Sequence, residues 1–181
     1  MAGTRALLAF ELRRLFRRPL AWALLALTAL LLAMLFIALV VRYLDDDTGS
    51  LRALGVTAEI LVRYFGTACL LTMLFIPLVT MQCVAAERRD GMLRFLFSAP
   101  AGSGAIVLAK FGAVALLLAL MWAIIGLLPV TLAWGAPIDF GVYATNLLGL
   151  ALFIVLHGAL GVMSSALTRQ PLAAALLALG I

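Results

Sequence analysis

Residues 19–41 read Pro-Leu-Ala-Trp-Ala-Leu-Leu-Ala-Leu-Thr-Ala-Leu-Leu-Leu-Ala-Met-Leu-Phe-Ile-Ala-Leu-Val-Val, a run of 23 positions without a charged side chain. A helix of this length rises about 34 Å, which is enough to cross a hydrocarbon core of about 30 Å. Apolar residues make up 66% of the chain and charged residues 12%, whereas soluble domains average about 45–50% and about 25%. The sequence therefore predicts an all-α polytopic membrane protein, because so few polar residues cannot cover a surface in water.

Further uncharged runs follow along the chain, and we detect neither an internal repeat nor a linker that would divide it. We expect one transmembrane domain over residues 1–181. The last uncharged run has only 11 residues, or about 16 Å as a helix, which is about half of a membrane. We predict four full transmembrane helices and a truncated fifth, over residues 19–41, 60–86, 105–130, 143–167 and 171–181.

Basic residues are distributed unequally between the two sets of connecting segments. Ten of the thirteen lie on the side that holds the N-terminus, and three lie on the opposite side. The positive-inside rule therefore predicts a cytoplasmic N-terminus. The net charge of +5 does not indicate nucleic-acid binding, because the basic residues cluster at the ends of apolar runs rather than over a folded polar face. We expect Tyr43, Tyr64, Tyr143 and Trp134 at the outer interface, Trp22 at the inner one, and Trp122 inside the bundle.

A basic amphipathic pattern precedes the first span, over residues 4–18. Leucines and a phenylalanine recur at helical spacing, with charged residues on the other side of the helix. The pattern predicts a helix in the inner headgroup layer, although an arginine-rich flank that only sets orientation explains it equally well. The residues concerned are Leu8, Leu12, Leu15 and Phe16 on the apolar side, and Glu11, Arg13, Arg14, Arg17 and Arg18 on the polar side.

The chain shows no constellation typical of catalysis, of cofactor binding or of a metal site. No glycine-rich phosphate loop is present, because Lys110 stands in Leu-Ala-Lys-Phe. The single histidine, His157, lies seven and eight residues before Ser164 and Ser165, which is about 10–12 Å along one helix and too far for a hydrogen bond. We favour a neutral packing histidine over a protease. Cys69 and Cys83 share one apolar run and form no disulfide framework.

Two further features of the second span bear on its geometry. Pro77 lies inside the apolar run, where a proline either breaks a membrane helix or only kinks it. Glu59 and Arg63 stand four residues apart near its start. This spacing predicts a weak surface ion pair of about 0.3–0.5 kcal/mol.

The connection after the second span reads Glu87-Arg-Arg-Asp-Gly-Met-Leu-Arg-Phe-Leu-Phe-Ser-Ala-Pro100. Gly91 can redirect the chain, and Pro100 disfavours helix at the residue before it. Leu93, Leu96 and Phe97 fall on one helical face between these two points. We predict a short helix over residues 87–100 with an apolar face that either the headgroup layer or a partner protein covers. These considerations favour neither cover.

The sequence resembles a known family in this region. Pro77-Leu-Val-Thr-Met-Gln-Cys-Val-Ala-Ala-Glu-Arg-Arg-Asp-Gly-Met-Leu-Arg-Phe-Leu-Phe-Ser-Ala-Pro100, followed by Ile106-Val-Leu-Ala-Lys-Phe111, is similar to the signature region of type-2 ATP-binding-cassette (ABC) exporter permeases. The likeness is closest to the gliding-motility and nitrous-oxide-reductase-maturation branch. Glu11-Leu-Arg-Arg-Leu-Phe-Arg-Arg-Pro19 and Gly161-Val-Met-Ser-Ser-Ala-Leu-Thr-Arg-Gln170 support it.

The resemblance implies specific roles for two segments, within a family pattern of six spans. The basic helix before the first span would be the interfacial elbow helix. The connection after the second span would be the coupling helix that docks on a separate ATPase. Its residues would be Glu87, Arg88, Arg89, Asp90, Gly91, Met92, Leu93, Arg94, Phe95, Leu96, Phe97 and Ser98.

The resemblance also implies a function. The chain would be the permease subunit of an ABC exporter for an unidentified substrate, in the plasma (inner) membrane of a bacterium or archaeon. It would not be an enzyme, since a cytoplasmic ATPase subunit would bind ATP and Mg²⁺ and hydrolyse the nucleotide. It would pair with a second copy or with a sister permease. The alternatives are a non-transporting membrane anchor that recruits a cytoplasmic partner, and an intramembrane enzyme that uses His157.

Overall fold

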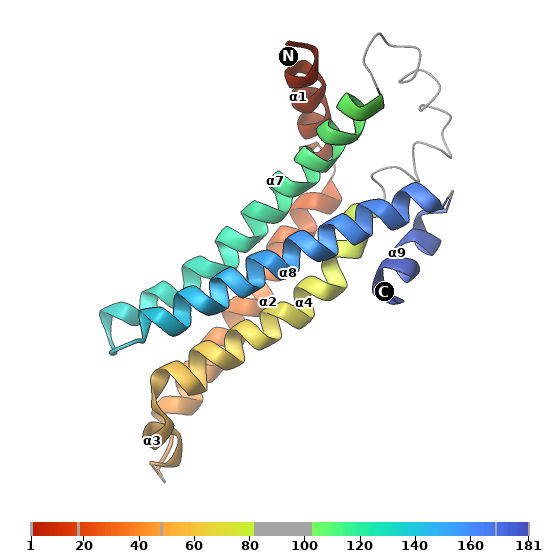
Figure 1. Cartoon of the computed structure of the whole chain (residues 1–181). Coiled ribbons are helices and arrows are strands. Elements are labelled where there is room, and N and C mark those ends of the chain that lie inside the picture. Colours follow the sequence, from red (N-terminus) through yellow and green to blue (C-terminus); the bar gives the residue numbers. More distant parts are fainter. Residues whose placement is uncertain (1, 18, 48, 82–102, 169, 181) are drawn as a thin grey trace.

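The computed structural model describes residues 2–17, 19–47, 49–81, 103–168 and 170–180, and all secondary structure within these ranges is helical (Figure 1). The elements are α1 (Ala2–Phe16), α2 (Pro19–Leu44), α3 (Ser50–Val56), the π-helix η1 (Thr57–Val62), α4 (Arg63–Thr80), α7 (Ser103–Val130), the 3-10 helix η2 (Thr131–Trp134), α8 (Phe140–Leu167) and α9 (Pro171–Gly180).

Four helical stretches are long and apolar enough to cross a membrane, which confirms the predicted all-α polytopic class. They cover Pro19–Leu44, Ala53–Thr80, Ile106–Trp134 and Phe140–Leu167. The second stretch starts earlier than predicted. It includes the end of α3, where the backbone is kinked at Gly55 (φ 84°), and η1 then leads directly into α4. The residues predicted for a fifth span form α9, a helix of 10 residues that packs against α8 and α4.

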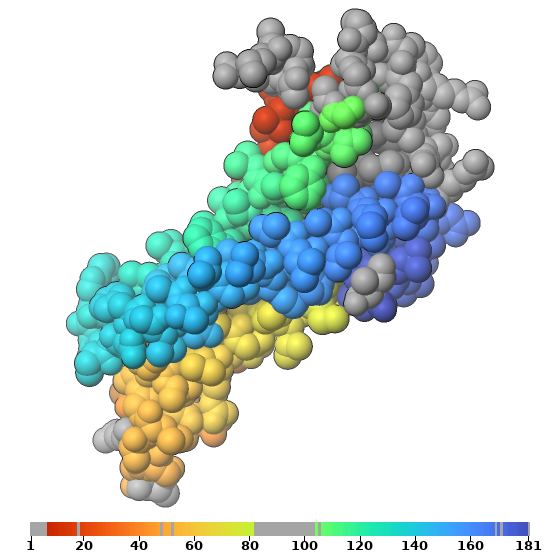
Figure 2. Space-filling view, in the orientation of Figure 1, coloured from red at the N-terminus to blue at the C-terminus, as the bar shows by residue number. Residues whose placement is uncertain are grey.

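The four long helices run alongside one another, and α7 and α8 form much of one face (Figures 1 and 2). We call the end at which α1 lies and α7 begins the α1 end, and the opposite end, where α3 lies, the α3 end. The described chain leaves α4 and enters α7 at the α1 end (Figure 1).

The core lies between α2, α4 and α7, with α8 closing one side. Small buried residues such as Ala21, Ala68 and Ala113 let the helices approach closely. Such packing matters in a bilayer because lipid tails are as apolar as leucine, so van der Waals contact rather than the hydrophobic effect holds helices together. The largest side chains that are fully buried include Leu32, Tyr64, Ile76, Leu117, Met121 and Ile125.

Tyr64 was predicted at the outer interface, and this prediction was wrong. Its side chain is fully buried, and its hydroxyl donates to the Ile125 carbonyl oxygen at 3.0 Å. Pro129 lies four residues after Ile125 and has no N–H, so the helix itself cannot satisfy that carbonyl. The tyrosine therefore supplies the donor that the proline removed, as a buried backbone acceptor in a membrane requires. Trp122 packs against the core as predicted.

Pro77 does not break α4. The helix continues through this residue to Thr80, and the Met81 N–H donates to the Pro77 carbonyl oxygen at 2.8 Å. The Thr80 hydroxyl also donates back, to the Ile76 carbonyl oxygen at 3.0 Å. These bonds keep the end of α4 helical at the last described position before residues 82–102.

The predicted pair of Glu59 and Arg63 is present but is not a surface pair. The guanidinium contacts both carboxylate oxygens, with Nη2 at 2.9 Å from Oε1 and Nε at 2.8 Å from Oε2. The Glu59 side chain is 8% exposed, whereas that of Arg63 is 48% exposed. The π-helical turn places Glu59 inward. The Glu59 carboxylate is therefore desolvated, whereas the Arg63 side chain remains half-exposed.

Candidate functional site

The predicted coupling segment, residues 87–100, lies outside the described residues. Its two attachment points are described, at Met81 after α4 and at Ser103 in α7. The helices α4 and α7 end and begin, respectively, toward the α1 end, where α1 itself lies (Figure 1). The candidate site that the structure describes is therefore the α1 end, where α1 packs against α7 and where α8 packs against the end of α4.

A buried ion pair joins α1 to α7. The Lys110 Nζ atom lies 2.8 Å from Glu11 Oε1, and the two side chains are 4% and 9% exposed. Glu11 was predicted on the polar side of the helix with the arginines, and this prediction was wrong: the carboxylate turns toward α7. Pairing is the physical reason, because two opposite charges in contact offset part of the cost of removing each from water.

The remaining predicted elbow residues divide only in part as their spacing predicts. Arg13 and Arg17 are exposed, whereas Arg14, the leucines and Phe16 are half-buried. Leu15 and Phe16 pack against the core. Arg18 lies outside the described residues. On the α7 side, a Cβ at Gly112 would lie 3.1 Å from the Leu8 Cδ1 atom, so this glycine lets α1 approach α7 closely.

Trp22 fixes the joint between α1 and α2. Its indole N–H donates to the Phe16 carbonyl oxygen at 2.7 Å, and the two rings meet edge to face with centroids 5.8 Å apart. The bond satisfies one of the carbonyls that the end of α1 leaves without a helical partner. Trp22 was predicted only at the inner membrane interface.

The end of α4 is held by α8. A Cβ at Gly161 would lie 2.9 Å from the Thr80 Cβ atom, so the two helices meet there with no room for a side chain. The Ser165 hydroxyl donates to the Met81 carbonyl oxygen at 3.1 Å. Among the described residues, the buried Ser164 hydroxyl has no hydrogen-bond partner. The chain thus enters residues 82–102 from a helix end that α8 restrains.

Comparison with protein families decides the class of this bundle. The family model described as ABC-2 family transporter protein matches residues 5–181. The chain belongs to the ABC-2 transporter family. No curated protein and no solved structure matches the chain. The family match confirms the resemblance to ABC-2 permeases, and the likeness to the gliding-motility and nitrous-oxide-reductase-maturation branch stays a prediction.

As a member of this family, the chain is a permease subunit of an ABC transporter, a component of membrane transport that is not itself an enzyme. The geometry at His157 agrees with a packing role in the ABC-2 permease. Its Nδ1 atom lies 3.2 Å from the Phe153 carbonyl oxygen, one turn earlier in the same helix. The imidazole also stacks on the Phe153 ring, with centroids 3.9 Å apart.

Sequence reasoning missed Lys110 as part of the ABC-2 permease's α1 end. One signal was available: Lys110 is the single charged residue between Arg94 and Asp139. An isolated charge next to an apolar run needs a partner or an exit to water. Nothing in the spacing of residues indicated that this partner is Glu11, 99 positions earlier.

Proposed function

We propose that this ABC-2 permease is the membrane-spanning subunit of an exporter driven by a separate cytoplasmic ATPase, which docks on the helix formed by residues 87–98. The family match over residues 5–181 carries this proposal. The family pairs its permeases with ATPase subunits, and residues 87–98 resemble the part of the family's signature region that would meet the ATPase.

The arrangement of the α1 end supports a path for transmitting motion. Residues 82–102 connect α4 to α7, so a displacement of this segment pulls on both helices. The Glu11–Lys110 pair passes motion of α7 to α1. The hydrogen bond between Ser165 and Met81 passes motion of α4 to α8. Closure of the ATPase subunits would therefore move several spans together as a rigid-body switch.

The remaining parts of the proposal follow from the family pattern and the charge distribution. ATP and Mg²⁺ would bind to the ATPase, because this chain has no glycine-rich phosphate loop. Two copies of the chain, or one copy and a sister permease, would line the transport path. The N-terminus would be cytoplasmic in the plasma membrane, which places the arginines of α1 at anionic headgroups.

Copurification tests the docking helix. The change Leu96→Asp together with Phe97→Asp puts two charges on its apolar face and is expected to abolish copurification with the ATPase. The matched control changes Leu44→Asp and Leu54→Asp, both 61% exposed near the α3 end, and should leave copurification unchanged. If the ATPase still copurifies with the first variant, residues 87–98 are not its docking site.

A non-transporting membrane anchor is the alternative to an exporter. The two functions differ in energetics, because a permease stimulates ATP hydrolysis by its partner whereas an anchor only recruits it. An ATPase that binds this chain in vesicles with no change in its hydrolysis rate would support the anchor.

A further inference from the structure

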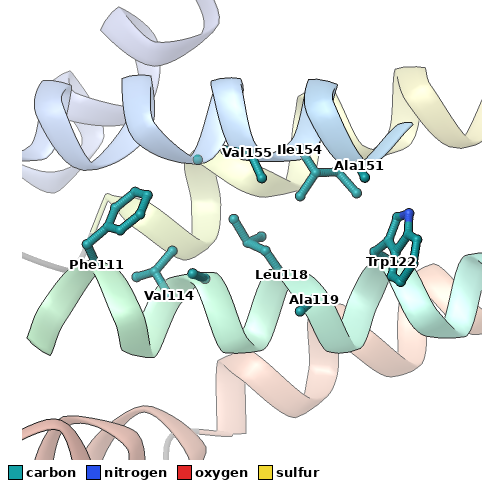
Figure 3. A pocket seen from close by; sticks show the side chains of 10 residues that line it. Phe111, Val114, Leu118, Ala119, Trp122, Ala151, Ile154 and Val155 are labelled. Atoms are coloured by element: carbon teal, nitrogen blue, oxygen red, sulfur yellow. The ribbon is translucent and has the colours of Figure 1, made fainter. Parts of the chain in front are cut away.

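A groove of about 200 Å³ lies between α7 and α8, within the part of the bundle that spans the membrane (Figure 3). All of its lining side chains are apolar except for the indole nitrogen of Trp122. The lining residues are Phe111, Val114, Ala115, Leu118, Ala119 and Trp122 of α7, with Ala151, Ile154, Val155 and Gly158 of α8.

Large and small side chains shape this groove. Phe111 and Trp122 stand at its two ends (Figure 3), 11 residues apart, or about 16 Å along the helix. Between them, small residues such as Ala115, Ala119 and Ala151 leave the space open. Leu118 forms part of the floor, since a Cβ at Gly158 would lie 2.6 Å from its Cδ1 atom.

The groove has no polar group to offer to a ligand. The Trp122 indole N–H, its one polar atom in a side chain, already donates to the Leu147 carbonyl oxygen at 2.9 Å. A ligand with a buried donor or acceptor would lose its hydrogen bonds to water and find none here, at a considerable cost. An occupant must therefore be hydrocarbon along its whole inserted length.

The size of the groove distinguishes between two apolar occupants, a transmembrane helix and a chain of methylene groups. A transmembrane helix is about 10–12 Å in diameter with its side chains, and a stable protein interface takes about 20–30 residues a side. Ten residues and 200 Å³ are too little for a helix of a second copy. A cavity of about 150 Å³ binds benzene, so this groove suits one flexible chain of methylene groups.

We infer that the groove between α7 and α8 binds a single acyl chain of a membrane phospholipid. The surrounding medium supplies this ligand, because the groove lies between two membrane-spanning helices and two of its lining residues, Ala119 and Val155, are exposed. The inference stands independently of the docking helix and of the ATPase, since no residue of either contributes to the groove.

Trp122 provides a direct measurement. In a chain with Trp22→Phe and Trp134→Phe, Trp122 is the single tryptophan, and vesicles of phosphatidylcholine brominated in mid-chain quench a tryptophan that their acyl chains contact. We expect strong quenching of Trp122. Ala119→Phe fills the groove from its exposed edge and should lower the quenching at least twofold, and Ala151→Phe should do the same from the other wall.

The control is Ala123→Phe, which adds the same side chain at an exposed alanine of α7 outside the groove and should leave the quenching unchanged. Equal quenching in the Ala119→Phe and Ala123→Phe variants overturns the inference, because it places the bromines outside the groove. A change of oligomeric state on Ala119→Phe overturns it too, since the occupant would then be a second copy. Size-exclusion chromatography and thermal unfolding establish that each variant is folded.

Discussion

The ion pair between Glu11 and Lys110 yields a prediction with a definite magnitude. Glu11→Gln keeps the shape of the side chain and removes the carboxylate that Lys110 contacts at 2.8 Å. Removing one partner of a buried pair costs about 3–5 kcal/mol. Because both side chains are less than one-tenth exposed, the solvent screening that weakens surface pairs is small here. The amide still accepts a hydrogen bond, so we expect a loss near the lower limit, about 3 kcal/mol.

The loss should appear first as release of α1, because α1 contacts the bundle mainly through α7 and α2. Arg13 and Arg17 are exposed trypsin sites within and just after this helix, and cleavage requires local opening. A change of about 3 kcal/mol corresponds to about a 100-fold increase in the open population, since each 1.4 kcal/mol is tenfold. The rate of trypsin cleavage in detergent should rise accordingly, where opening is fast relative to cleavage.

Glu59→Gln is the matched control. Glu59 is also buried, but its partner Arg63 is 48% exposed and lies in the next turn of the same helical stretch. Because Arg63 is half-exposed, the loss of this pair should cost less than the loss of the fully buried pair and should leave cleavage of α1 unchanged. Replacement of the first pair by apolar residues, Glu11→Leu with Lys110→Met, should restore most of the stability, because neither charge is then buried. If Glu11→Gln accelerates cleavage no more than Glu59→Gln does, the pair does not hold α1 on α7.

Two more predictions concern contacts between the long helices. Gly161→Ala should lower the thermal unfolding temperature by an amount equivalent to about 1–3 kcal/mol, because the added Cβ would lie 2.9 Å from the Thr80 Cβ atom. Gly149→Ala on the same helix is the control, since a Cβ there meets nothing within 4 Å. Equal effects of the two changes would contradict the close approach of α8 to α4. Tyr64→Phe should cost about 1–3 kcal/mol in denaturant unfolding by leaving a buried carbonyl without a donor. Adding Pro129→Ala returns a helical N–H to that carbonyl and should reduce the loss, and a loss that does not change would refute the role assigned to the proline.

The amphipathic pattern of α1 shows which side-chain positions helical periodicity can predict and which it cannot. It predicted the exposed positions of Arg13 and Arg17 correctly, because these depend on local helical geometry alone. It placed Glu11 with the arginines because all five residues are charged. Whether a charged side chain faces solvent or a distant partner depends on which helix packs against it, and a single helical period carries no information about that neighbour.

Tyrosines and carboxylates near the α3 end show the same limit. Tyr64 lies near the end of an apolar run, a position typical of an interfacial aromatic residue. Its burial follows from a carbonyl of α7 that lacks a donor, 61 residues away in the chain. Glu59 is desolvated because η1 is a π-helix, and the extra residue in that turn rotates it inward.

By itself, the sequence determined that the chain crosses the membrane as four helices. Uncharged runs of this length are most stable in hydrocarbon, and in a bilayer the backbone must satisfy its own hydrogen bonds, as a helix does. Tertiary structure decided which polar groups meet inside the bundle: Glu11 with Lys110, Tyr64 with Ile125, and Ser165 with Met81. Those pairings depend on the rotation and depth of each helix against its neighbours. In lipid, close packing and hydrogen bonds set that rotation and depth rather than apolar periodicity, since nearly every face of these helices is apolar.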